Sequence, residues 1–362
     1  MKEKPSPSID IKNQKIDRFN KRINATLGGA VGTLILLEAI AGVRYSQEVP
    51  NASIEKVAES MIRHNKVAFD NLLQLDRCTP LSDPGDINRL SESVIHSSET
   101  DAEEIAKRNN IELMDFSHIV ALGDTLQNAT SKEEISGAVN ELTQTQMGLN
   151  IHAEGIHKDQ SVNTEDYKHK MWLFTLTLRD ISKTVLDKLE IEDITIRPED
   201  SDNTNAVAQY NQMTRSVAID LEKLDSPGTV LHEIIGHGAH AVTCDDTSIN
   251  DRLFMTYNPS NYQYTNDEWR STQYAQNEYA DNYATKNVLE DYAQTTQKYF
   301  TGEIKANLEH PSSPLDKKVM LILDRLNQVA PGSAEYLSSQ INRFAAFEHA
   351  HNQRIAQANA KK

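Results

Sequence analysis

Residues 231–240 read Leu-His-Glu-Ile-Ile-Gly-His-Gly-Ala-His, and the interpretation of the chain starts from them. His232 and His237 are strong metal ligands, Glu233 is a carboxylate beside the first, and the apolar residues recur at helical spacing. The common zinc signature H-E-x-x-H sets its histidines four residues apart, so that both imidazoles reach one metal ion from one face of a helix. Here the separation is five residues.

This spacing conflicts with a regular α-helix. Five residues rotate about 500°, which would leave the two histidine side chains roughly 140° apart instead of about 40°. A one-residue π-bulge removes the conflict, and such bulges are frequent at functional sites. Gly236, next to the second histidine, accepts a local distortion at low steric cost. The sequence therefore predicts a π-bulge in a metal-binding helix, and an ordinary amphipathic helix with polar histidines is the alternative.

The residues before the motif predict two short strands and a helix start. Residues 206–210 and 216–221 have strand character and are separated by a polar turn. Ser226 is the expected N-cap and Pro227 the first helical residue. An edge strand beside a metal helix can hold an extended peptide substrate as one more strand.

A second helix is predicted over residues 273–292, and Glu278 on it is the expected third metal ligand. A carboxylate from a second helix commonly completes a site whose first helix supplies two histidines. Asn277 offers only a neutral amide and does not compete with it. A solvated surface position for Glu278 and Asp281 is the alternative.

The segment 206–284 resembles a zincin-type zinc metallopeptidase of the group that uses a glutamate as third ligand. The six residues from His232 to His237 resemble the H-E-x-x-G-H signature of the dipeptidyl peptidase III family, and Glu-Tyr-Ala-Asp at 278–281 is similar to glutamate-helix motifs of several zincin families, including lethal-factor-like toxin proteases. The resemblance covers roughly 80 of 362 residues. One departure is the register: in those families the ligand glutamate commonly stands three or more residues before the alanine of its motif, whereas Glu278 stands two before Ala280.

The resemblance implies a zinc ion on His232, His237 and Glu278, with Glu233 as the general base that activates water. His240 is expected near the ligands or at the surface, and Asp281 would orient a ligand imidazole. A tyrosine or histidine that stabilises the oxyanion is also expected. The tyrosine candidates are Tyr257, Tyr262, Tyr264, Tyr274, Tyr279 and Tyr283.

Composition limits the partners of this chain. A net charge of -16 disfavours nonspecific binding to nucleic acid. The substrate that the resemblance implies is a peptide or protein. Cys78 and Cys244 could pair in an oxidising compartment, but nothing in their spacing indicates that they do.

The N-terminus combines a basic tail, residues 1–24, with an apolar segment, residues 25–43. The apolar segment is about long enough to span a bilayer once, and it also suits a signal sequence. We therefore expect a membrane-anchored or exported protein, with a cytoplasmic protein whose segment is an ordinary buried helix as the alternative.

The remaining chain is divided by its periodicity. Residues 44–165 predict an all-helical domain, and residues 166–362 an α+β zincin-like domain with a small mixed sheet and metal-binding helices. A zinc-dependent peptidase, acting more as an endopeptidase than as an exopeptidase, is the expected function. The competitor is a catalytically inactive zincin-like or helical binding protein that works through its N-terminal domain. Histidines that converge would favour the enzyme, and splayed histidines the binding protein.

Overall fold

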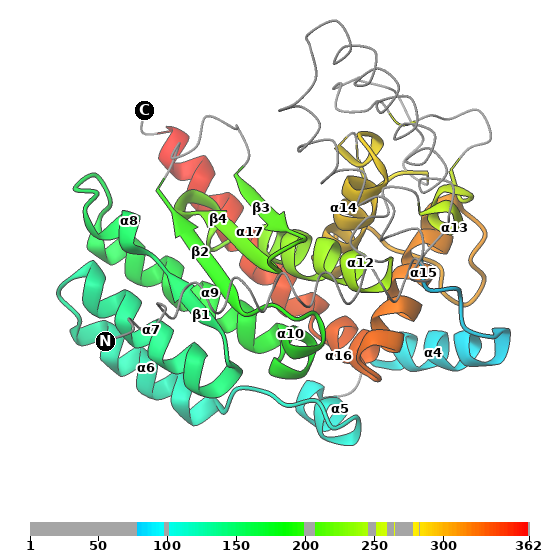
Figure 1. Cartoon of the computed structure of the whole chain (residues 1–362), viewed down its shortest axis with the longest axis horizontal. Helices are drawn as coiled ribbons and strands as arrows, with labels where there is room; N and C mark the ends of the chain where they lie inside the picture. Colours follow the sequence, from blue (N-terminus) through cyan, green and yellow to red (C-terminus); the bar gives the residue numbers. More distant parts are fainter. Residues whose placement is uncertain are drawn as a thin grey trace, which may run out of the picture. The chain divides into compact units, whose positions relative to one another are not determined.

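The computed structural model describes residues 78–97, 101–198, 207–244, 251–258, 264, 278–281 and 283–360 (Figure 1). The basic tail, the apolar segment 25–43 and the start of the expected helical domain lie outside these residues. Among the helices that the structure describes, none is both long enough and apolar enough to cross a membrane.

The described chain is mostly helical, with one small sheet. The α-helices and strands are α4 (Pro84–Ser97), α5 (Ala102–Arg108), α6 (Phe116–Asn128), α7 (Lys132–Met147), β1 (Asn150–His152), α8 (Glu154–His157), α9 (Thr164–Ile181), α10 (Lys183–Lys188), β2 (Asp193–Arg197), β3 (Ala208–Asn211), β4 (Ser216–Asp220), α11 (Pro227–Leu231), α12 (Gly238–Thr243), α13 (Arg252–Met255), α14 (Val288–Phe300), α15 (Pro314–Val329), α16 (Ser333–Ser339) and α17 (Ile341–Ala360). A π-helix spans His232–His237, and 3₁₀-helices span Leu221–Lys223 and Tyr283–Thr285.

The four strands lie in the order β1-β2-β4-β3. β1, β2 and β4 are parallel, whereas β3 pairs antiparallel with β4 and forms an edge. α7 packs against β1 at one edge, and the π-helix packs against β3 at the other. The expected α+β class with a small mixed sheet is confirmed, and the sheet positions the helix of His232 and His237 beside β3, the last strand among the described residues.

The expected division at residue 166 does not coincide with a division of the structure. Residues 73–362 form one compact unit. β1 comes from the region assigned to the helical domain, yet Ile151 pairs with Ile194 of β2. One hydrophobic cluster also extends from Leu90 to Phe344. β1 has only three residues, which is too short to show the alternation by which a strand is recognised in sequence.

The two cysteines pair: Cys78 and Cys244 form a disulfide. Their sequence positions are 166 residues apart, so only the tertiary structure could show this pairing. The bond joins the first described residue of the chain to the end of α12, beyond the metal helix.

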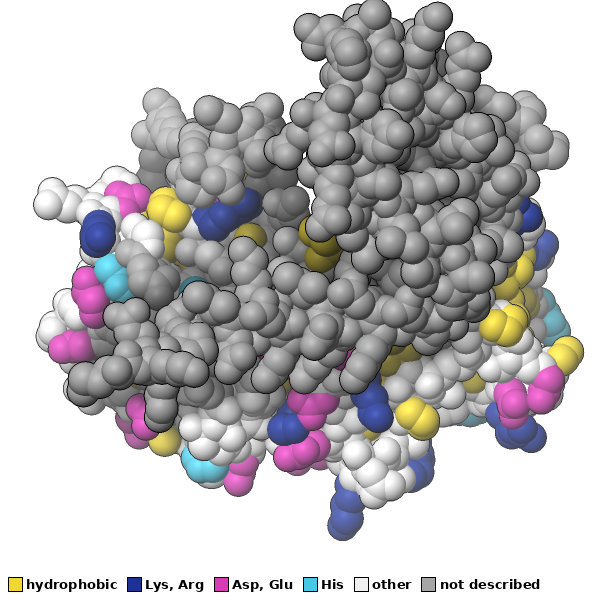
Figure 2. All heavy atoms as spheres, viewed as in Figure 1, with side chains coloured by type: hydrophobic (Ala, Val, Ile, Leu, Met, Phe, Trp, Pro, Cys, Tyr) yellow, Lys and Arg dark blue, Asp and Glu magenta, His cyan; other side chains and the backbone are white. Residues whose placement is uncertain are grey.

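Charged side chains of both signs are interspersed among the described residues. Figure 2 shows Lys and Arg side chains next to Asp and Glu side chains along the lower edge of one face. Such a mixture does not concentrate positive charge on that part of the surface, which is the electrostatic feature that nucleic-acid binding requires.

Candidate metal centre

The π-bulge predicted from the histidine spacing is confirmed, and it extends over the whole motif. Residues His232–His237 form a π-helix that continues α11 into α12. Because a π-helix bonds residue i to residue i+5, side chains five apart lie on one face. The His232 and His237 rings lie 4.9 Å apart between their centroids, at an angle of 81°. Both histidines therefore face the same point.

The start of the metal helix also follows the prediction. Ser226 is the N-cap, and its side chain accepts a hydrogen bond from the backbone N–H of Thr229. Pro227 is the first helical residue. The Glu348 carboxylate, from α17, accepts further bonds from the Ser226 hydroxyl and the Gly228 N–H, both at 2.9 Å. These bonds satisfy donors at the helix start that would otherwise lack a partner.

Gly236 is required by a close contact between helices. A Cβ atom at this position would lie 2.5 Å from the Ala293 Cα and 2.8 Å from the Ala293 Cβ. Ala293 belongs to α14, which crosses the π-helix here. A small residue on each helix lets the two backbones approach, and this approach brings α14 side chains to the histidines.

The carboxylate beside the two histidines is Glu290, not Glu278. The Glu290 Oε2 lies 3.2 Å from the His232 Nε2 and 3.6 Å from the His237 Nε2. One ligand atom from each of these three residues lies within 4.8 Å of the other two, so the group could hold a metal ion. Burial raises the pKa of Glu290, but hydrogen bonds from His232 and His237 outweigh it and hold the pKa below its usual value.

Among the described residues, the expected helix over 273–292 is absent between residues 278 and 287 and present only from Val288 onward. Residues 278–281 form turns and bends, and α14 begins only at Val288, with the Asn287 side chain accepting a hydrogen bond from the Glu290 N–H. Glu278 thus precedes the helix, and its backbone oxygen accepts a hydrogen bond from the Lys318 Nζ at 3.1 Å. Glu278 is not part of the group formed by His232, His237 and Glu290. This agrees with its position two residues before Ala280, where the resembled families commonly have three or more.

Two signals in the sequence point to Glu290. It stands three residues before Ala293, which is the register that the resembled families commonly show. Asn287 and Glu290 also have the three-residue spacing of a residue that caps a helix and a carboxylate in its first turn. The Glu-Tyr-Ala-Asp similarity at 278–281 drew the prediction to the earlier glutamate.

Glu233 is a buried carboxylate beside the metal ligands and the edge strand. Its side chain is 6% exposed, and its Oε2 has no hydrogen-bond partner among the described residues. The backbone N–H of Tyr210, on β3, bonds to this carboxylate. Burial raises the pKa of Glu233 to about 7. The neighbouring His232 lowers this pKa, and the negative charge of Glu290 raises it. A carboxylate in this range can exchange a proton near neutral pH.

The tyrosine candidates occupy different positions. Tyr283 is the one nearest the ligands among the described candidates, with its ring centroid 6.1 Å from that of His232. Tyr264 donates a hydrogen bond to Asp291, and Tyr279 lies under the Lys318 ammonium. Tyr257 packs against the hydrophobic core, and Tyr262 and Tyr274 lie outside the described residues. A further ring, that of Tyr210, stacks near His237 at 6.4 Å.

Asp281 and His240 do not contact the ligand pair as expected. The Asp281 carboxylate accepts hydrogen bonds from Gln294 and from the backbone of Tyr283, so it orders the segment before α14 instead of orienting an imidazole. His240 lies beside Asp251, in a second cluster of polar side chains.

Comparisons of the chain with protein-family models, with curated proteins and with solved structures find no match.

Proposed function

We propose that this protein is a zinc-dependent peptidase with a zincin-like catalytic domain, acting as an endopeptidase. The observation that supports the proposal is the convergence of His232, His237 and Glu290 on one point, with Glu233 beside them at an edge strand. Two imidazoles, a ligand carboxylate and a base form the set of groups that zinc peptidases use.

The donor atoms fit a zinc ion. In a tetrahedral site with bonds of about 2.0–2.2 Å, neighbouring donor atoms are roughly 3.3–3.6 Å apart. Glu290 Oε2 lies 3.2 Å from one histidine nitrogen and 3.6 Å from the other. His232, His237 and Glu290 would hold the ion, which supplies Lewis acidity and lowers the pKa of water.

Glu233 would act as the general base. It would take the proton that the attacking water loses and deliver it to the leaving amine. Its raised pKa of about 7 suits both steps, because the carboxylate has to accept and then release the same proton. Burial also excludes solvent that would compete for this proton.

The edge strand β3 would bind the substrate backbone. β3 is the last strand of the sheet and packs against the π-helix that contains Glu233. An extended peptide can add to such an edge through main-chain hydrogen bonds, largely independently of its side chains. A peptide that lies along an edge can continue past the site at both ends, which supports endopeptidase activity.

The metal ligands can be tested by the zinc content of the full-length protein with its disulfide intact. We expect one zinc ion per chain in the wild type, and loss of it in His232→Ala, His237→Ala and Glu290→Gln. Glu278→Gln is the matched control and should keep the ion, because Glu278 lies outside the group. Retention in Glu290→Gln with loss in Glu278→Gln would contradict the assignment.

The activity can be tested with mixed peptides and denatured proteins, with cleavage products identified by mass spectrometry. Wild type should cleave internal peptide bonds, and Glu233→Gln should keep zinc but lose cleavage, because the variant lacks the base and not a ligand. Zinc binding without cleavage by the wild type would favour the inactive binding protein. Unchanged turnover in Glu233→Gln would exclude this mechanism.

A further inference from the structure

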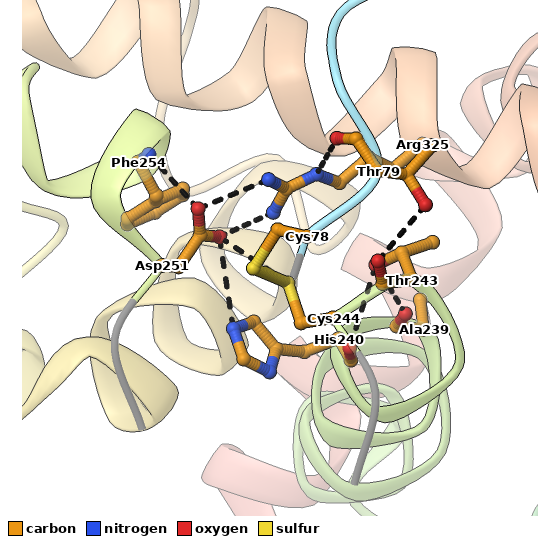
Figure 3. Close-up of a disulfide and its surroundings, with 9 residues drawn as sticks. All are labelled: Cys78, Thr79, Ala239, His240, Thr243, Cys244, Asp251, Phe254 and Arg325. Atoms are coloured by element: carbon orange, nitrogen blue, oxygen red, sulfur yellow. Dashed lines mark hydrogen bonds and ion pairs between the residues drawn. A yellow bond between two sulfur atoms is a disulfide. The ribbon is translucent and has the colours of Figure 1, made fainter. Parts of the chain in front are cut away.

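A second cluster of potential metal ligands lies at the far end of the metal helix. It consists of Cys78, His240, Cys244 and Asp251, one ligand atom of each lying within 4.8 Å of the others. Figure 3 shows these side chains pointing toward one another from three chain segments. His240 and Cys244 are four residues apart, about one helical turn, so α12 presents both on one side.

His240 has a ring nitrogen directed into this cluster. The side chain is 2% exposed, and its Nε2 makes no close hydrogen bond among the described residues. Its partner is the Asp251 Oδ2, which faces it at 3.6 Å. A contact of this length satisfies a buried nitrogen less well than a close hydrogen bond does, so a bound metal ion would improve its environment.

The distances suit a tetrahedral metal site. With zinc–sulfur bonds of about 2.3 Å and zinc–nitrogen or zinc–oxygen bonds of about 2.0–2.2 Å, neighbouring donor atoms are roughly 3.3–3.8 Å apart. Asp251 Oδ2 lies 3.6 Å from the His240 Nε2 and 3.6 Å from the Cys244 Sγ. The two sulfur atoms, which are bonded to each other, would have to separate.

Cys78 is held beside the cluster by bonds other than the disulfide. The backbone N–H of Thr79 donates to the Thr243 oxygen at 2.6 Å, and the Thr79 hydroxyl donates to the same oxygen at 2.9 Å. The Arg325 Nε bonds the Thr79 oxygen at 3.4 Å. The ligand set would therefore stay together after the disulfide is reduced.

The charges also balance. Arg325 makes a buried ion pair with Asp251, so the cluster is neutral when the cysteines form a disulfide. With zinc bound, two thiolates and the Asp251 carboxylate would contribute three negative charges. The zinc ion and the Arg325 guanidinium would contribute three positive charges, so the buried cluster would again be neutral, as a low-dielectric site requires.

We propose that Cys78, His240, Cys244 and Asp251 form a second zinc site in the reduced protein, and that the disulfide is the zinc-free, oxidised form of the same cluster. A dithiol reductant supplies two electrons and two protons, which break the S–S bond and leave two thiols. Zinc binding then displaces the two thiol protons to solvent, because the thiolate is the metal ligand. The cluster crosslinks the same segments in both forms.

The first test is the metal content of the full-length protein in two redox states. Zinc content should double, from one ion per chain when oxidised to two when reduced with a dithiol and repurified. Both thiols should be shielded from a thiol reagent until a chelator removes the zinc. Equal zinc content in the two states, or loss of the native circular dichroism spectrum on reduction with zinc present, would overturn the proposal.

Cobalt substitution distinguishes the two sites by their ligands. The reduced cobalt protein should show a thiolate-to-cobalt charge-transfer band, because only the second site contains sulfur. The band should persist in His232→Ala, which loses the first site, and disappear in Cys78→Ser. A reduced cobalt protein without this band would overturn the second site and leave the proposed peptidase site untouched.

Discussion

The contact between Gly236 and Ala293 makes Gly236→Ala the most informative substitution at the helix crossing. The added methyl group would lie 2.5 Å from the Ala293 Cα, 2.8 Å from its Cβ and 3.2 Å from its oxygen. Optimal carbon–carbon contacts are about 3.5–4.0 Å, so the two helices would have to separate by roughly 1 Å. The obstacle is backbone, which cannot rotate away as a flexible side chain can.

The expected magnitude follows from two opposing effects. Overpacking in a close-packed interior costs about 1–3 kcal/mol, and replacing glycine by alanine in a helix returns up to about 1 kcal/mol. We therefore expect the free energy of unfolding to fall by about 1–2 kcal/mol. Because Glu290 lies on the displaced helix, the same change should weaken zinc binding about tenfold, which corresponds to about 1.4 kcal/mol.

Gly238→Ala is the matched control, two residues further along the same helix. Its new methyl group would meet Ile191 and Leu189 side-chain carbons at 3.4 Å, which is ordinary contact distance. We expect its stability to be unchanged or to rise by up to about 1 kcal/mol. Urea unfolding of the zinc-free proteins and zinc titration against a competing chelator would compare the two variants. Equal stability and equal zinc affinity of both variants would refute the argument from helix approach.

Three further predictions concern charged side chains that are buried or half-buried. The Lys318 ammonium lies 2.7 Å from the fully buried Asp291 carboxylate. Lys318→Met removes the positive charge of this pair and should lower the free energy of unfolding by about 3–5 kcal/mol. A loss below about 1 kcal/mol in urea unfolding would contradict this. Burial raises the pKa of Asp180 to about 6. Between this pKa and that of the unfolded chain, the folded state holds a proton that the unfolded state releases. The free energy of unfolding should therefore rise as the pH falls from 7 to 4. Asp180→Asn removes this titration. The free energy of unfolding of the variant, measured relative to wild type, should therefore be about 2–3 kcal/mol lower at pH 4 than at pH 7. A difference that does not change with pH would contradict this. The Glu348 carboxylate accepts hydrogen bonds from Ser226 and Gly228 at the start of the helix of His232 and His237. Glu348→Gln removes the negative charge from these bonds and should lower the free energy of unfolding by about 1–2 kcal/mol. An unchanged melting temperature in thermal unfolding would argue against a stabilising role of Glu348.

Local chemistry made several elements predictable. The five-residue histidine spacing required a π-helical segment for a shared metal ion, and the structure has one. Ser226 and Pro227 marked the helix start correctly. The strand expected at 216–221 is β4, which ends one residue earlier. In each case the signal lies within a few consecutive residues.

The errors arose where distant contacts determine the structure. The helical stretch before β2 is divided at Ser182, whose φ of 83° ends α9 and whose side chain caps α10. The carboxylate that joins the two histidines is Glu290, 12 residues after the expected Glu278, because the choice between them depends on which helix approaches Gly236. The disulfide and the second cluster depend on a sequence separation of 166 residues, which spacing rules do not cover.

The π-helix also sets the rotational phase of everything that follows it. Five residues of a π-helix turn about as far as four residues of an α-helix, so the extra residue between the two histidines is absorbed within the segment. If the same residues formed a regular α-helix, α12 would turn by about 100° relative to α11, and His240 and Cys244 would point away from Asp251 although none of the three had been changed. The backbone hydrogen bonding of this short segment therefore constrains two clusters at once.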